Sequence, residues 1–184
     1  MHKRLLGVDL GTSTGIAYVD FMPGQPINGA QVVLGQWSLE LGKYDSGPLR
    51  HIRLQQFLSI LAPDIILFEN VKYDAPAESF RGKPIGAIVA RIVPTAEFLG
   101  GLKVTLSTWA AMHDVPCQGL EIAEIKRWLA GKGNASKVEM INACNARFGT
   151  SLDPETYEST GADNMADAAA ICGMGLEFYS DGLS

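Results

Sequence analysis

Four acidic residues occupy positions from which they could do metal chemistry. Asp9 and Glu69 each follow an apolar segment typical of a buried strand, and Asp163 and Asp167 lie four positions apart in a later segment. Residues four apart share one face of a helix. Converging carboxylates repel one another unless cations hold them, and hard oxygen ligands suit Mg²⁺ or Mn²⁺. Two such ions can activate a water and stabilise the leaving oxygen of a phosphodiester.

The segments before Asp9 and Glu69 predict neighbouring strands. Leu5 to Val8 and Ile16 to Val19 are apolar and are joined by a glycine- and threonine-rich turn. The continuous apolar run "DIILFE", which ends at Glu69, predicts a central parallel strand. Because parallel strands end at the same edge of a sheet, we expect Asp9 and Glu69 to lie together there, where open α/β sheets bind ligands.

The remaining pattern predicts one α/β domain spanning residues 1–184. Further strands are expected over 30–40 and within 114–120, and helices over 49–61, 85–112, 121–130, 136–148 and 163–179. Pro94 and the pair Gly100–Gly101 predict a kink or an interruption in the second of these helices. This order of elements predicts a central mixed five-stranded sheet with helices on both faces.

Composition narrows the class of protein. Of 184 residues, 47% are hydrophobic and 19% charged, which is typical of a globular chain.

No apolar run reaches transmembrane length and no signal-peptide core precedes the first strand, so we expect a cytoplasmic protein with no membrane association. Cys117, Cys144 and Cys172 have neither disulfide nor zinc spacing and are expected to be reduced thiols. The net charge of −5 argues against a general nucleic-acid coat but is compatible with a nucleic-acid enzyme, because an acidic metal site lowers the total.

Each acidic residue has a structural alternative. Asp9 could form the turn, Glu69 could end its strand beside a lysine, and Asp163 could cap its helix. Asp167 is harder to explain in this way, because its neighbours from Met165 to Ile171 are largely apolar and would not normally accept a lone carboxylate. Taken together, the four residues favour a metal site.

Four segments in this order resemble the RuvC-type Holliday junction resolvases, in particular the branch found in bacteriophages and related elements. They are "GVDLGTSTGIA" around Asp9, "ILFENV" around Glu69, "GKGNASKVEM" from Gly131, and "DNMADAAAI" from Asp163. The resemblance extends from Leu5 to about Met174. It implies a ribonuclease H-like fold, a homodimer, and Mg²⁺- or Mn²⁺-dependent nicking of two symmetric strands of a four-way DNA junction, leaving 5′-phosphate ends, in a bacterial or phage-infected cell.

The same resemblance assigns the catalytic metal ligands. Asp9 and Glu69 match the first two ligands of the family, and Asp167 matches the last. The remaining ligand stands three or four positions before the last one and is usually Asp or His. Asn164 occupies the first of these positions and Asp163 the second. A carboxylate is the better ligand, so we predict Asp163.

Two basic segments are predicted to contact DNA. The resemblance implies phosphate contacts for Lys132 and Lys137 in "GKGNASK", although the segment could simply link two helices with Ser136 as a cap. The loop after Glu69 could stack on an exposed base at a junction and hold a flanking phosphate, or be only a solvated loop. Its basic and aromatic residues are Lys72, Tyr73, Arg81 and Lys83.

Three other classes of protein are alternatives to a junction resolvase. Sugar kinases and actin-like ATPases also begin with Asp, Gly and Thr, but their domain is duplicated and this chain has neither the length nor a second glycine-rich turn. A nuclease of flaps, other branches or RNA-containing substrates would use the same metal chemistry. A catalytically inactive nucleic-acid-binding module would have no need of four acids.

The symmetry of a four-way junction predicts a homodimer. One chain carries one acidic cluster, and two symmetric cuts need two sites related by a two-fold axis. The alanine-rich helix over 85–112 is the expected surface for pairing, with Ile88, Ile92 and Phe98 as candidates that could equally belong to the core.

Overall fold

The computed structural model describes residues 2–24, 31–70 and 85–180, without the side chains of 85–94 and 180. A five-stranded sheet in the order β3-β2-β1-β4-β5 forms its centre. β1 pairs antiparallel with β2 and parallel with β4, while β2–β3 is antiparallel and β4–β5 is parallel. The predicted mixed five-stranded sheet is therefore confirmed. The strands are β1 (Lys3–Asp9), β2 (Ser13–Phe21), β3 (Val33–Ser38), β4 (Ile65–Glu69) and β5 (Cys117–Leu120).

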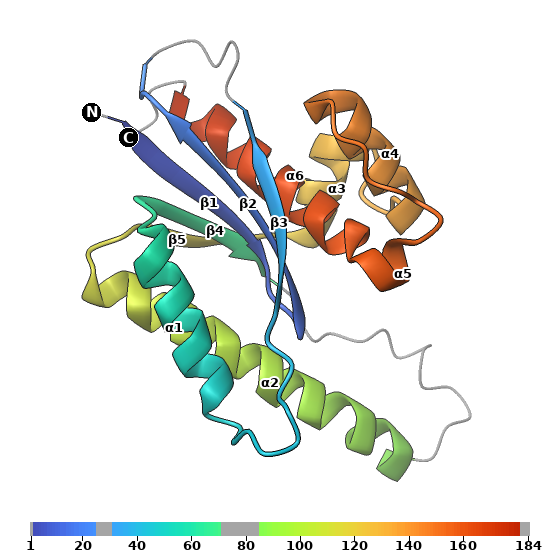
Figure 1. The fold of residues 1–184 in the computed structure, drawn as a ribbon. Helices are drawn as coiled ribbons and strands as arrows, with labels where there is room; N and C mark the ends of the chain where they lie inside the picture. Colours follow the sequence, from blue (N-terminus) through green and yellow to red (C-terminus); the bar gives the residue numbers. More distant parts are fainter. Residues whose placement is uncertain (1, 25–30, 71–84, 181–184) are drawn as a thin grey trace.

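Helices cover both faces of the sheet, as the sequence predicts (Figure 1). α1 (Leu49–Leu61) and α2 (Ile85–Met112) lie on one face. α3 (Ile122–Ala130), α4 (Lys137–Phe148) and α6 (Ala162–Ser180) lie on the other, with the short α5 (Tyr157–Thr160) just before α6. None of the helices in the described ranges is both long and apolar enough to cross a membrane.

Side chains of β1 alternate between two hydrophobic clusters, because successive residues of a strand point to opposite faces. Leu5 belongs to the cluster that includes residues of α3, α4 and α6. Leu6 and Val8 belong to the cluster that includes residues of α1 and α2. Burial on both sides explains why this strand is a continuous apolar run in the sequence.

Two glycines allow α6 to lie directly on the sheet. A Cβ atom at Gly7 would stand 2.6 Å from the carbonyl oxygen of Ala168 in α6. A Cβ atom at Gly15 would overlap the carbonyl oxygen of Asn164. The strands β1 and β2 therefore meet the backbone of α6 without an intervening side chain, and this close approach fixes the height of the helix above the sheet.

Helix boundaries mostly follow the predictions. Ser136 accepts a hydrogen bond from the Glu139 amide and receives the Glu139 side chain at its own amide, which forms a complete capping box at the start of α4. The helix predicted over 85–112 is confirmed as α2, and the alternative that it is interrupted at Pro94 or Gly100–Gly101 is wrong, because the helix is continuous from Ile85 to Met112. A proline removes one backbone hydrogen bond without having to end a helix, and the second half of α2 is anchored by buried side chains such as Leu102 and Leu106.

Candidate active site

The ends of β1 and β4 place Asp9 and Glu69 side by side. Val8 pairs with Phe68 in the parallel register, and each carboxylate is the next residue on its strand. Val8 and Phe68 face α1 and α2. Strand alternation therefore directs Asp9 and Glu69 to the opposite face, which α6 covers. The expected meeting of these two residues at one edge of the sheet is thus present.

The first two turns of α6 supply the other two carboxylates. Asp163 is buried in the first turn, and Asp167 is partly buried one turn later. Ala168, the residue after Asp167, lies against Gly7 of β1, so the start of the helix is held beside the end of that strand. The chain thereby brings the four predicted acidic residues to one place.

Asp9, Glu69, Asp163 and Asp167 form a carboxylate cluster, in which burial and the charges of the other members act strongly on Asp9 and Asp167. Burial raises the pKa of Asp9 well above its usual value, and the negative charges of Glu69, Asp167 and Asp163 raise it further. Burial and the charge of Glu69 raise the pKa of Asp167 to about 7. Burial also raises the pKa of Glu69. Perturbed carboxyl groups that face one another in this way are typical of functional sites.

Asp163 and Asn164, the two alternatives for the fourth position, have different roles in the structure. The Asn164 side-chain amide donates a hydrogen bond to the carbonyl oxygen of Ser13 at 2.9 Å, which ties α6 to the hairpin of β1 and β2. The Asp163 carboxylate instead takes part in the electrostatics of Asp9 and Asp167. This arrangement favours Asp163 as the fourth acidic group.

Two lysines bring positive charge to the cluster. The Lys137 ammonium lies 2.6 Å from Asp163 Oδ2, and this hydrogen bond raises the pKa of Lys137 above its usual value. Lys126 of α3 donates to the Ala135 carbonyl oxygen at 3.0 Å, and its charge partly offsets the raised pKa values of Glu69 and Asp167.

Lys126 was not predicted from the sequence as a residue of this site. The last residue of β5, Leu120, pairs with Glu69, and α3 begins two residues later. A lysine in the second turn of α3 therefore lies close to the carboxylates. Lys126 could have been predicted from its place just after a predicted parallel strand, because ligand-binding groups gather at that edge of a sheet.

The donor chemistry of the cluster fits a hard divalent cation. Carboxylate oxygens are the ligands that Mg²⁺ and Mn²⁺ prefer. Here they are close together and partly buried, and their repulsion makes it unfavourable for Asp9 and Asp167 to be ionised at the same time without a cation. In the part of the chain that the structure describes, no three histidine, cysteine or acidic side chains are already arranged around one point as ligands. The residues therefore fit such an ion by chemistry, and their side chains would have to converge further to hold it.

The predicted DNA contacts lie in two regions. Lys132 pairs with Glu139 at 2.6 Å within the α4 capping box, and Lys137 pairs with Asp163; both lysine side chains are more than half exposed. The other four predicted contacts, in the loop after Glu69, lie outside the described residues; they are Lys72, Tyr73, Arg81 and Lys83.

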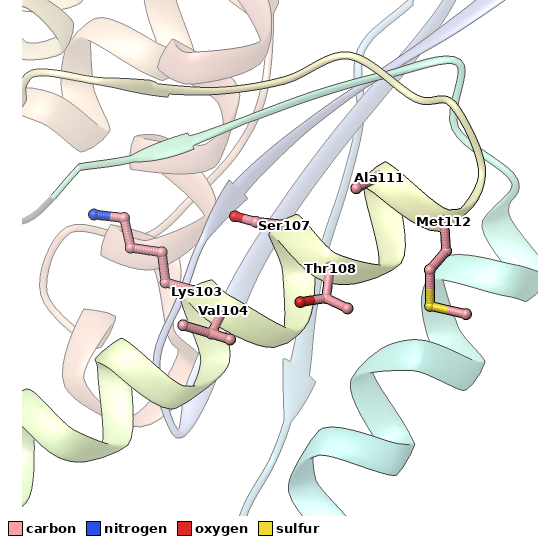
Figure 2. A pocket seen from close by; sticks show the side chains of 6 residues that line it. All are labelled: Lys103, Val104, Ser107, Thr108, Ala111 and Met112. Carbon is pink, nitrogen blue, oxygen red and sulfur yellow. The ribbon is translucent and has the colours of Figure 1, made fainter.

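A separate hollow of about 640 Å³ runs along α2 (Figure 2). The helix α2 lies on the other face of the sheet from α6 (Figure 1). At one end of the hollow, Lys103 donates a hydrogen bond to the side chain of Asn70, the residue after Glu69. The hollow therefore begins near the end of β4 and leads away from the carboxylate cluster. It is lined by Lys103, Val104, Ser107, Thr108, Ala111 and Met112.

In the protein without bound metal, ionisation of the Asp167 carboxyl group should lower the free energy of unfolding. Its pKa is raised from 3.8 to about 7 on folding, so the stability associated with its protonated form is fully present below pH 3.8 and is lost as the pH rises through about 7. Without divalent cations at pH 8, Asp167→Asn should raise the free energy of unfolding, on the order of 2 kcal/mol. The gain should shrink steadily as the pH falls to 4, as measured by urea unfolding with a chelator.

Asp20→Asn is the matched control, because the hydrogen bond from Arg4 lowers the pKa of Asp20. That variant should lose stability at pH 8 instead of gaining it. Equal stability of the wild type and Asp167→Asn at both pH values would contradict the electrostatic account of the cluster.

Comparison with known proteins gives a match of structure without a match of sequence. No protein-family model and no curated protein matches this chain. Thermus thermophilus RuvC superposes with a TM-score of 0.62 at 19% identity, over 96% of this chain and 98% of that protein. The yeast mitochondrial Holliday junction resolvase Ydc2 gives 0.60 at 17% identity, over 97% of this chain and 82% of that protein.

Two further solved structures are complexes with DNA. Thermus thermophilus RuvC with a Holliday junction substrate has a TM-score of 0.61 at 20% identity, over 95% of this chain and 97% of that protein. The Fowlpox virus resolvase with Holliday junction DNA gives 0.53 at 11% identity, over 96% and 99%. The resemblance inferred from the sequence is thereby confirmed for the fold: over nearly its whole length, this chain folds as the RuvC-type Holliday junction resolvases do.

Proposed function

We propose that this protein is a metal-dependent, structure-selective DNA endonuclease that nicks symmetric strands of four-way junctions. The observation that carries the proposal is the carboxylate cluster, built by the ends of two parallel strands and the start of α6 in a fold shared with junction resolvases. A structural role would not require four acidic groups to meet at a place where burial and repulsion disfavour the charges of Asp9 and Asp167.

Asp9, Glu69, Asp163 and Asp167 would hold the metal ions. With two Mg²⁺ or Mn²⁺ ions bound there, the site would gain the means to activate a water and to stabilise the leaving 3′-oxygen, which is the chemistry that would leave a 5′-phosphate. Asp9 and Glu69 act as the rigid half of the site, because strand pairing fixes their backbones. Asp163 and Asp167 approach from α6. Lys126 lowers the net negative charge beside Glu69 and Asp167, which limits the repulsion of an incoming phosphate.

Lys132 and Lys137 are the proposed phosphate contacts among the described residues. Both stand at or just before the start of α4, with more than half of each side chain exposed. A chain with a net charge of −5 needs local positive charge to bind DNA, and the start of a helix adds backbone N–H donors. Branched DNA is the proposed partner on these grounds, and two of the similar structures contain Holliday junction DNA.

A panel of substrates tests this proposal. Four labelled substrates of shared sequence, namely a four-way junction, a flap, a linear duplex and an RNA–DNA hybrid, are incubated with the protein in Mg²⁺ and in a chelator. We expect paired symmetric nicks in the junction, ligatable products and no cutting in chelator. Faster cutting of the flap or the hybrid would transfer the proposal to that substrate, and no cutting of any substrate would favour an inactive binding module.

A homodimer is part of the proposal, because two symmetric cuts need two sites. Among the residues named from the sequence for pairing, Phe98 is partly buried in the core, with the Arg50 guanidinium 4.7 Å from its ring centroid. The side chains of Ile88 and Ile92 are outside the described set. Val104 and Met112, whose exposed fractions are 66% and 74%, are the better candidates on α2.

Val104→Glu should therefore give folded monomers that nick one strand of a junction and seldom resolve it. Sedimentation velocity compares this variant with the wild type and with Val138→Glu, a matched change at an exposed valine of α4. The control should remain dimeric. A wild type that sediments as a monomer both free and on junction DNA would remove paired cleavage from the proposal.

A further inference from the structure

Lys137 joins a largely exposed ammonium group to a buried carboxylate. Its side chain is 59% exposed, whereas the side chain of Asp163, its partner at 2.6 Å, is only 9% exposed. The ammonium also lies 5.1 Å from the ring centroid of Tyr157, which offers it a second, weaker attraction. Because the Asp163 side chain is buried on α6 and the lysine stem is exposed, we expect this pair to separate by movement of the lysine.

The two neighbouring lysines are bound differently. Lys132 forms an ion pair of the same length, but its partner Glu139 is 44% exposed and serves the capping box of α4. Lys126 donates to the Ala135 carbonyl oxygen, a backbone group that needs no cation. Among the lysines of the described residues, Lys137 is therefore the one whose ammonium is hydrogen-bonded to a carboxylate of the cluster.

An ammonium in this place competes with a divalent cation. It engages an oxygen of Asp163 that a metal ion would need, and its positive charge repels another cation at short distance. A divalent ion interacts with the other carboxylates as well, which the single ammonium cannot do. The long flexible lysine stem then lets the displaced charge move outward to a phosphate.

We propose that Lys137 is an exchangeable counter-charge of the active site. It neutralises Asp163 in the cation-free protein, leaves when a divalent cation takes that carboxylate, and then becomes available to DNA. Cation binding and DNA binding strengthen each other through this exchange, because such coupling is reciprocal. The proposal rests on the proposed function, since it assigns the cation to the carboxylate cluster and the phosphate to DNA.

Calorimetric titration of Mn²⁺ into the protein without DNA tests the exchange. Lys137→Met, which removes the charge and keeps most of the length, should bind Mn²⁺ about tenfold more tightly than the wild type, the strength of one charge-assisted hydrogen bond. Lys137→Arg should restore affinity close to that of the wild type. Lys132→Met is the matched control and should leave Mn²⁺ affinity unchanged. Lys137→Gln, also uncharged, gives an independent repeat.

A second titration measures the coupling. Junction binding is followed with and without Ca²⁺, and the gain in affinity from the cation should be smaller in Lys137→Met than in the wild type. A wild type that binds Mn²⁺ and cuts junctions, together with a Lys137→Met variant of unchanged Mn²⁺ affinity, overturns the role of Lys137 alone. A wild type that binds no Mn²⁺ overturns both this inference and the metal-dependent nuclease.

Discussion

Asp9→Asn is expected to reduce junction cleavage in Mg²⁺ by at least about a hundredfold, the cost of losing one well-placed electrostatic group in an active site. The change removes a charge and almost no volume at the end of β1, so the fold and junction binding should survive. Single-turnover cleavage and a gel-shift titration measure the two quantities separately. Asp20→Asn, which makes the same chemical change at the exposed partner of Arg4, should cut at the wild-type rate.

The other acidic positions extend this test. Glu69→Gln and Asp167→Asn should behave as Asp9→Asn does, and Asp163→Asn should cost at least about tenfold. Asn164→Ala should mainly lower stability, because it removes the hydrogen bond to Ser13 that ties α6 to the hairpin. Near-wild-type cutting by any of the first three variants would remove that residue from the site. A larger loss for Asn164→Ala than for Asp163→Asn would transfer the fourth position to Asn164.

Gly15→Val is expected to lower the free energy of unfolding by about 3 kcal/mol or more, at the upper end of the cost of overpacking. A Cβ at this position would overlap the backbone of Asn164, so neither a rotamer change nor a small side-chain shift relieves it. The helix α6 itself has to move. Because that helix carries Asp163 and Asp167, divalent-cation affinity should fall together with stability.

Gly35→Val on the neighbouring strand β3 is the matched control, because a Cβ there meets nothing within 4 Å. Valine favours strands, so this variant should be as stable as the wild type or slightly more stable. Urea unfolding and Mn²⁺ titration of both variants check the expectation. A Gly15→Val protein with the stability of the wild type would show that α6 can sit higher on the sheet.

Local sequence patterns predicted much of the fold. The apolar runs that end in Asp9 and Glu69 predicted two strands that are present and parallel, and the apolar spacing over 49–61 matches α1 residue for residue. The cap at Ser136 was predicted in the same way and forms a full capping box. These features depend on residues within a few positions of one another, which is why sequence patterns reveal them.

The same reasoning failed where tertiary packing outweighs a local preference. The helix over 85–112 was predicted with the bounds of α2, but the interruption expected at Pro94 or Gly100–Gly101 is absent, and the second half of α2 packs through buried residues such as Leu106. β3 is shorter at both ends than the predicted strand over 30–40, and α5 was not predicted. One lost hydrogen bond or a short polar turn is a small energy beside the burial of several large side chains.

The sequence by itself determined which acidic residues stand at strand ends and on one helix face, because strand alternation and helical spacing are local geometry. It could not decide what each neighbour of those acids does. Asn164 anchors α6 through Ser13, Lys137 is bonded to Asp163, and Lys126 lies beside the cluster. These partners are 151 positions apart in the first pair and 26 in the second. Hydrogen bonds and charges act through space, so only the packing of α3, α4 and α6 against the sheet could bring these partners together.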